Sequence, residues 1–296
     1  MPSSSPEPDD VFHPDGYELI DSGNQRKLER FGSVVLSRPC SQAAWRPRLD
    51  EARWAGADAE FDREEGNRWK GRSPLPKEWI LHIADFRLRL SGTDFGHLGV
   101  FPEQQVLWRW IGDTLRAAHR PTALRVLNLF AYSGGATLAA AQANAEVCHL
   151  DASRGMVDWA RANAELNGLS GRPVRWIVDD VHKFLNREIR RNRPYDAILL
   201  DPPSFGRGRE GELYKIEQDL PETLDLCGRL LSDTPLFLLL SAHTPGFTPV
   251  ALTNLLQQAL PDQTRGFEQG EMLLTGRPGV LPVPSGAFGR WSAERA

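Results

Sequence analysis

The sequence has few cysteines, and they form no recognisable framework. Its 296 residues include only Cys40, Cys148 and Cys227, an odd number that lie far apart without paired metal-ligand spacing. A disulfide scaffold or a zinc site is therefore not expected, and no metal is assigned. This cysteine usage favours a reducing, cytoplasmic setting.

Long apolar runs and a secretory leader are also lacking. No stretch is long and apolar enough to span a bilayer, and the chain does not open with a basic segment followed by an apolar one. We therefore expect no membrane partner.

Positive charge is not in excess. The chain has 35 Lys and Arg against 39 Asp and Glu, for a formal net charge of −4. This balance argues against a generally basic nucleic-acid-binding protein, although a local basic patch remains compatible with it. The partner must be inferred from local features.

Composition divides the chain into three parts. Residues 1–15 are rich in Pro, Ser and acid and predict a flexible tail. Residues 16–98 have short strand-like runs, which predict a small, mainly β module on the substrate side. Within it, Phe86, Leu88 and Leu90 alternate with arginines, as in a strand with one solvated face. Most tryptophans before residue 109 are expected to fill the core; base stacking by one of them is the alternative.

Residues 99–296 alternate strand and helix patterns. After an amphipathic helix in QQVLWRWIGDTLRAAH, continuous apolar strands such as LRVLNLF and PLFLLLSAH are separated by helical segments. This pattern indicates an α/β, doubly wound parallel sheet covered on both faces. The closing GEMLLTGRPGVLPVPSGAFGRWSA suggests an antiparallel pair at the sheet edge.

Polar and glycine residues follow the predicted strands. VLNLF opens into the turn AYSGG, the next strand ends in Asp151, the third ends in VDD and the fourth in LLDPP. Because the carboxyl ends of parallel strands meet at one edge, these groups are expected to share a crevice. Taken alone, Asp151 could equally cap the following helix.

The crevice lacks a phosphate-binding signature. The G-x-G-x-x-G spacing of dinucleotide enzymes is missing. A Gly-rich turn, acids and no phosphate cradle suit a nucleoside with a cationic, non-phosphorylated tail, and S-adenosylmethionine is such a ligand.

Four segments of the chain also resemble those of a known protein family. The segments NLFAYSGGATLAAA, HLDASRGMVDWARANAELNGL, DDVHKFL and YDAILLDPPSFG closely resemble class I S-adenosylmethionine-dependent methyltransferases that modify large-subunit ribosomal RNA, over about residues 95–245. The resemblance implies a seven-stranded, mostly parallel Rossmann-like sheet with an antiparallel edge, and ribosomal RNA as partner. HLGVFPEQ is similar to the family's K-T-G-F-x-L-D-Q stretch, with His97 and Glu103 replacing Lys and Asp.

The resemblance also implies the cofactor-binding residues. By position they are Phe101, Gln104, Phe130, Tyr132, Ser133, Gly134, Gly135, Asp151, Asp180 and Asp201. The loop at 130–135 would surround the methionine part, Asp151 would bind the ribose, Asp180 the adenine amino group, and Asp201 would face the methionine end. Asp180 could instead cap a helix, Tyr132 could only pack, and spacing hardly separates Asp180 from Asp179.

The Asp-Pro-Pro turn is the expected acceptor side. Similar turns in the family hold the target base, so Asp201 and the Pro202 carbonyl would accept from it while Phe205 stacks on it. The alternative is a rigid turn that ends a strand, with Phe205 packed inward. Arg207 and Arg209 follow the turn and are expected to bind phosphates as substrate contacts.

The lack of one cysteine narrows the choice of the atom that accepts the methyl group. Relatives that make 5-methylcytosine carry a cysteine nucleophile in a Ser-Cys-Ser stretch, where this chain has Ser241, Ala242 and His243. Cys227 falls in a helical apolar pattern, which favours burial. A base nitrogen, which needs no covalent adduct, is therefore the expected acceptor. His243 could be a base or substrate contact, but a capping or loop role is favoured.

Other readings remain open. Lys183, Arg187, Arg190, Arg191 and Arg193 form a basic cluster that could bind RNA or simply be a solvated helix face. The family's N-terminal RNA-binding module is not visible. The same fold acting on a small molecule or a protein is one alternative, and a catalytically silent binding module is another.

Overall fold

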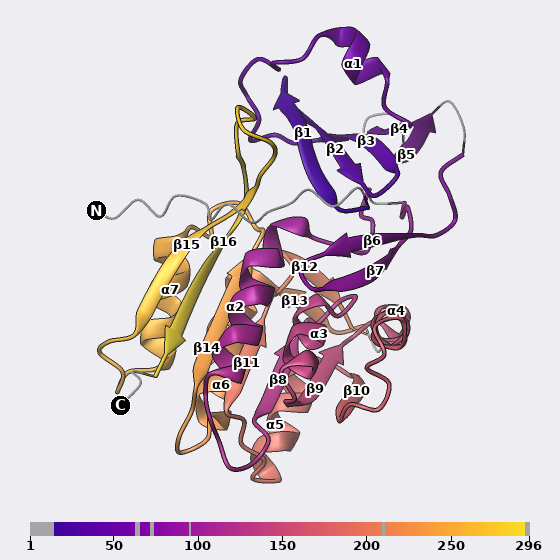
Figure 1. The fold of residues 1–296 in the computed structure, drawn as a ribbon. Coiled ribbons are helices and arrows are strands. Elements are labelled where there is room, and N and C mark those ends of the chain that lie inside the picture. The colour runs from indigo at the N-terminus through magenta and orange to yellow at the C-terminus, as the bar shows by residue number, and fades with distance from the viewer. Residues whose placement is uncertain (1–14, 63–65, 72–73, 95, 209–210, 294–296) are drawn as a thin grey trace. The chain divides into compact units, whose positions relative to one another are not determined.

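The computed structural model describes residues 15–62, 66–71, 74–94, 96–208 and 211–293 (Figure 1). They form two compact units. The first runs to Leu98 and also includes Leu274–Val283; the second comprises Gly99–Leu273 and the residues from Pro284 onward. Apart from Asp15, the expected flexible tail lies outside the described residues, as does Arg209.

The first unit is mainly β. A five-stranded sheet has the order β1-β2-β3-β4-β5, and β6 and β7 form a separate antiparallel pair. The elements are β1 (Tyr17–Gly23), β2 (Arg26–Phe31), β3 (Val34–Pro39), α1 (Glu51–Ala55), β4 (Ala59–Asp62), β5 (Arg68–Gly71), β6 (Trp79–Ile83) and β7 (Phe86–Leu90). In β7, Phe86, Leu88 and Leu90 are buried and Arg87 is exposed, as the alternation predicted.

The segment Leu274–Val283 belongs to this unit because its apolar ends enter the first unit's core. Leu274 and Val283 are buried in one cluster with Leu19, and the Leu19 amide donates to the Thr275 carbonyl at 3.3 Å. Composition alone did not indicate that a segment from the far end of the sequence would complete the first unit.

Four early tryptophans are half-buried rather than fully enclosed. Each indole N–H donates to a nearby oxygen: Trp45 to Ser22, Trp54 to Asp21, Trp69 to Thr93 and Trp79 to Phe31. Pairing the one polar group of a large ring in this way lets it pack without leaving a buried donor unsatisfied.

The second unit contains the predicted α/β sheet. Its seven strands have the order β10-β9-β8-β11-β14-β16-β15, with β8 to β11 and β14 parallel and β16 antiparallel to β14. The strands are β8 (Arg125–Leu129), β9 (Glu146–Asp151), β10 (Val174–Val178), β11 (Ala197–Leu200), β14 (Phe237–Ala242), β15 (Phe267–Leu274) and β16 (Val283–Ser292). The predicted doubly wound fold with an antiparallel edge is confirmed.

Helices cover the sheet on both faces (Figure 1). In Figure 1, α2 and α3 lie over one face, while α5, α6 and α7 pack in succession on the other. The helices are the short η1 (Pro102–Gln104), α2 (Gln105–Arg116), α3 (Gly135–Gln142), α4 (Arg154–Leu166), α5 (Val181–Arg190), α6 (Ile216–Leu230) and α7 (Pro249–Ala259). A small separate pair, β12 (Phe205–Arg207) and β13 (Leu213–Lys215), follows β11.

Burial explains the apolar strand patterns. Every residue of β11 and of β14 is buried, as expected for parallel strands covered on both faces. The expected amphipathic helix is α2, in which Leu107, Ile111 and Leu115 are buried, while the apolar Val106 is exposed. Within the described ranges, we find no helix with the length and apolarity needed to cross a membrane.

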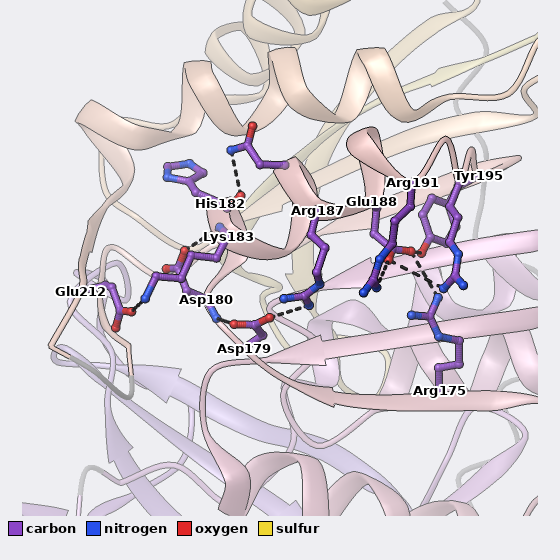
Figure 2. Close-up of polar contacts among 12 residues, drawn as sticks. Arg175, Asp179, Asp180, His182, Lys183, Arg187, Glu188, Arg191, Tyr195 and Glu212 are labelled. Carbon is purple, nitrogen blue, oxygen red and sulfur yellow. Dashed lines mark hydrogen bonds and ion pairs between the residues drawn. The ribbon is translucent and has the colours of Figure 1, made fainter.

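A buried carboxylate ties α5 to the edge of this sheet. Glu188 is fully buried and accepts from the Tyr195 hydroxyl at 2.7 Å and from Arg175 of β10 at 3.2 Å (Figure 2). Arg191 and Arg193 approach its other oxygen at 3.6 and 4.0 Å. Burial alone would raise the pKa of Glu188, but the bonds from Tyr195 and Arg175 outweigh it and lower the pKa.

Replacing Glu188 with Gln should lower the free energy of unfolding by about 1–3 kcal/mol, because the arginines lose a buried anionic partner. Urea unfolding at neutral pH measures this, with the exposed Glu165→Gln as matched control. Because folding lowers the pKa of Glu188, its carboxylate stabilises the fold at a pH above the ordinary carboxyl pKa. The difference in unfolding free energy between the wild type and Glu188→Gln should therefore shrink as the pH falls through the folded-state pKa of Glu188. Equal stability of both variants at neutral pH would contradict the assignment.

Candidate active site

The site lies where the strand order of the large sheet reverses, between β8 and β11. Loops that leave the carboxyl ends of two such strands run in opposite directions and open a crevice. Eight predicted site residues line this crevice, namely Phe101, Gln104, Phe130, Tyr132, Ser133, Gly134, Gly135 and Asp201. Segments far apart in sequence are therefore brought together here as expected.

The loop after β8 has an unusual backbone. Phe130 and Tyr132 have φ values of +54° and +50°, a region that bulky side chains rarely adopt. The Tyr132 amide donates to an Asp151 carboxylate oxygen at 3.0 Å, and the Ala131 amide donates to the Leu150 carbonyl. Contacts to the end of β9 thus hold a strained loop, a feature that concentrates at functional sites.

The two glycines in this loop are needed for different reasons. Gly134 has a φ of +95° and immediately precedes α3. A Cβ on Gly135 would lie 2.4 Å from the Trp108 ring, so only glycine lets α3 start this close to α2. Ser133 is also structural in part, since its hydroxyl donates to the Gly99 carbonyl at 2.5 Å.

Asp151 lies behind the loop rather than among the crevice-lining residues. Its two oxygens accept from the amides of Tyr132 and Ser153 at 3.0 and 2.8 Å. Burial raises the pKa of Asp151, and these two hydrogen bonds only partly oppose the rise. Each oxygen keeps a second acceptor position, which is the chemistry that two ribose hydroxyls require.

Asp179 and Asp180 are both engaged elsewhere. Asp180 caps α5 by accepting from the Lys183 amide at 2.9 Å, and Asp179 pairs with Arg187 at 2.6 Å (Figure 2). Both carboxylates are absent from the residues lining the crevice. Asp180 therefore caps α5, which was the alternative to a cofactor role. Any contact with adenine would have to use its second carboxylate oxygen.

Asp201 is held by donors from two other segments. One carboxylate oxygen accepts from the Gln104 side-chain amide at 2.6 Å, and the other accepts from the Ser241 hydroxyl at 2.8 Å. The latter oxygen also lies 3.5 Å from Nδ1 of His243. Burial alone would raise the pKa of Asp201, but His243 and these hydrogen bonds lower it, so the group is an anion at neutral pH.

His243 bridges two carboxylates, a role that the sequence analysis did not assign. Its Nε2 lies 3.1 Å from Glu103, opposite the Asp201 contact, and its ring lies 4.9 Å from that of Phe101. Burial alone would lower the pKa of His243, but Asp201 and Glu103 raise it to about 10. His243 lies in the loop directly after β14, as the loop alternative expected, but there it also bridges two carboxylates, and its imidazolium cannot accept a proton near neutral pH.

Five further lining residues were not predicted, namely Val100, Trp108, Asn128, Ala131 and Ala136. Among them, the Asn128 amide donates to Thr137 at 2.9 Å. A sequence signal existed for Asn128, because it is the one polar residue inside the apolar run VLNLF. Trp108 lies in an ordinary helical pattern, which gave no such signal.

The Asp-Pro-Pro turn leads out of the crevice to the surface. Strand β11 ends at Leu200, Pro202 is buried, and the Ser204 hydroxyl bonds with Thr244 at 2.7 Å. Phe205 is 54% exposed and Arg207 is exposed. The alternative in which Phe205 packs inward is therefore wrong.

Four of the five cations in the basic cluster of α5 and its exit lie near a carboxylate of the chain. Lys183 pairs with Glu212, Arg187 with Asp179, and Arg191 approaches Glu188 (Figure 2). Arg193 also approaches Glu188, at 4.0 Å. Charges engaged in this way are weakly available to phosphates, which favours the solvated-face interpretation of this helix.

Comparisons with known proteins agree with this geometry. The family described as S-adenosylmethionine-dependent methyltransferase matches residues 22–241. A solved S-adenosylmethionine-dependent methyltransferase from Agrobacterium tumefaciens is 39% identical, with a TM-score of 0.87 over 94% of this chain and 90% of that one. The chain belongs to the S-adenosylmethionine-dependent methyltransferase family.

Curated relatives are similar over shorter stretches. Ribosomal RNA large subunit methyltransferase K/L of Syntrophotalea carbinolica is 38% identical over 38% of this chain and 17% of its own length. Ribosomal RNA large subunit methyltransferase K of Neisseria meningitidis is 28% identical over 71% of this chain and 61% of its own. The chain thus spans less than two thirds of either relative.

The crevice fits the family's cofactor. Asp201 lines the crevice and suits a cationic sulfonium, Asp151 at the end of β9 suits a ribose diol, and the rings of Phe101 and Tyr132, 5.4 Å apart, offer apolar faces. These residues would hold the cofactor of the S-adenosylmethionine-dependent methyltransferase family to which the chain belongs.

In a pH titration followed by nuclear magnetic resonance, the His243 ring should titrate at about pH 10. Because this pKa is above the ordinary value of 6.5, the stabilisation from the bridge is complete below pH 6.5 and is lost as the pH rises through about 10. His149 is an internal reference, since burial lowers its pKa to about 3. Asp201→Asn should move the His243 titration toward neutrality; a wild-type His243 that titrates near 6.5 would refute the bridge.

Proposed function

We propose that this enzyme methylates a base nitrogen of ribosomal RNA in the cytoplasm. The single observation that carries the proposal is the placement of Asp201 in the same crevice as the strained 130–135 loop, four residues before an exposed Phe205. The names of the curated relatives support ribosomal RNA as the substrate class.

Roles for the crevice residues follow from their chemistry. Bound S-adenosylmethionine supplies an electrophilic methyl carbon on a sulfonium. Asp151 is proposed to accept from the ribose hydroxyls, and the 130–135 loop to enclose the methionine part. Asp180 remains a proposed adenine contact through its second oxygen. Phe101 and Gln104 cover the cofactor, and Gln104 also fixes Asp201.

The Asp-Pro-Pro turn forms the proposed binding site for the base that accepts the methyl group. The Asp201 carboxylate and the Pro202 carbonyl accept from the base, while Phe205 stacks on its face and Arg207 binds an adjacent phosphate. Positioning the nitrogen lone pair in line with the methyl carbon supplies most of the rate. Arg209 keeps its proposed phosphate role from the sequence, although it lies outside the described residues.

Thiol chemistry supports nitrogen as the acceptor. All three cysteines are buried, and burial raises the pKa of Cys148 to about 11 and that of Cys227 further still. A covalent mechanism at a pyrimidine carbon needs an accessible thiolate. The environments of these thiols therefore favour a reaction that needs no covalent adduct.

The first unit, proposed to span residues 16–98, is assigned to substrate binding. A cavity of about 340 Å³ within it is lined in part by Arg26 and Trp54. A cationic and an aromatic side chain on the wall of one cavity support a nucleotide as its ligand.

Asp151→Asn should weaken binding of S-adenosylhomocysteine about 10- to 100-fold in calorimetry, because the amide oxygen alone cannot accept from both ribose hydroxyls while holding two backbone amides. Asp158→Asn, on the exposed face of α4, is the matched control and should bind normally. Unchanged affinity in a folded Asp151 variant would remove this residue from the cofactor site.

Ribosomal RNA from cells that lack the protein should accept a labelled methyl group from S-adenosylmethionine when the purified enzyme is added. Digestion and mass spectrometry should locate the label on a base nitrogen, and Asp201→Asn should slow the transfer at least tenfold. Label on a pyrimidine carbon would contradict the nitrogen assignment. Label only on protein or small molecules, or no transfer at all, would support the alternative functions.

A further inference from the structure

The β12–β13 hairpin has two unlike faces. Its register places Phe205 opposite Lys215, Gly206 opposite Tyr214 and Arg207 opposite Leu213. Because side chains alternate along a strand, Gly206 and Tyr214 share one face and the other residues share the opposite face. Tyr214 is buried, whereas Phe205 and Leu213 are 54% and 52% exposed.

The inner face anchors the hairpin. The Tyr214 ring lies 4.9 Å from that of Phe130 in the loop after β8, and its hydroxyl lies 3.3 Å from that of Thr223. The Ile216 amide donates to the Ser204 carbonyl at 3.3 Å. The hairpin is therefore built onto the same loop that lines the crevice, so its outer face is held in place.

The outer face combines apolar groups with available charge. Arg207 and Lys215 are both exposed, and neither forms an ion pair with the described part of the chain. Nearby Lys183 and Arg187 do form such pairs. Two exposed apolar side chains opposite two unpaired cations, with no carboxylate among the four, suit a ligand with flat apolar surfaces and regularly placed negative charge.

Single-stranded RNA has this chemistry. Its unstacked bases pack on apolar and aromatic side chains while Lys and Arg follow the phosphates. A protein partner is less well matched, since lysine is depleted at the core of protein interfaces and four residues provide little area. The outer face also begins at Phe205, directly beyond the turn proposed to hold the target base.

We propose that Phe205, Arg207, Leu213 and Lys215 form a docking strip for the single-stranded RNA next to the methylated nucleotide. This inference rests on the proposed RNA substrate and adds the second strand of the hairpin, Leu213 and Lys215, to the substrate contacts. Leu213 packs against a base, and Lys215 binds a phosphate.

Fluorescence polarisation tests the strip with a fluorescein-labelled, single-stranded 12-nucleotide RNA of mixed sequence, in the presence of S-adenosylhomocysteine and at several salt concentrations. Leu213→Ala should weaken binding about threefold to tenfold without changing its salt dependence. Lys215→Gln should weaken it similarly and reduce the salt slope by about one phosphate contact. Val250→Ala and Arg154→Gln, which alter exposed residues of α7 and α4, are the matched controls.

Both hairpin variants should bind S-adenosylhomocysteine like the wild type in calorimetry, which shows that the fold and crevice are intact. If the wild type binds and methylates RNA but these variants keep its RNA affinity and salt slope, the strip is wrong and the proposed function stands. If the wild type neither binds nor methylates RNA, both proposals fail. Loss of binding to a protein with unchanged RNA affinity would assign the face to that protein and overturn the strip.

Discussion

The arrangement of the site depends on one half-buried carboxylate that stays charged. Burial alone would raise the pKa of Asp201, but His243, Ser241 and Gln104 lower it. These donors come from the segment before α2 and from the end of β14, so a single side chain fixes three parts of the second unit around the crevice. Removing any donor would leave a half-buried charge with fewer hydrogen bonds, which lowers the stability of this arrangement.

The bridge through His243 also limits the chemistry. An imidazolium between Glu103 and Asp201 is a donor on both sides and has no basic nitrogen to offer near neutral pH. If the acceptor is the proposed base nitrogen, a ring nitrogen with a free lone pair has no proton to lose, and a proton from an amino group would leave by another route, such as solvent. This suits methyl transfer, in which the nucleophile needs orientation more than deprotonation when it carries a free lone pair.

Much of the fold could be predicted from the sequence because parallel strands covered on both faces appear as continuous apolar runs. The crevice could be predicted because its loops directly follow those strands. What could not be predicted depends on distant pairing: Glu103 and His243 lie 140 residues apart, and Leu274 joins the first unit's core only through tertiary packing. Asp180 follows a strand and precedes a helix, so position alone could not separate its capping role from a ligand role, and the charge partners of α5 come mostly from other elements.

The most direct test of the central claim is a crystal structure of the enzyme with S-adenosylhomocysteine. The account predicts the ribose hydroxyls on Asp151, the homocysteine part inside the 130–135 loop, and the sulfur facing the turn at Asp201, with His243 still between Glu103 and Asp201. A ligand bound away from this loop, or an Asp201 side chain released from Gln104, Ser241 and His243, would contradict it.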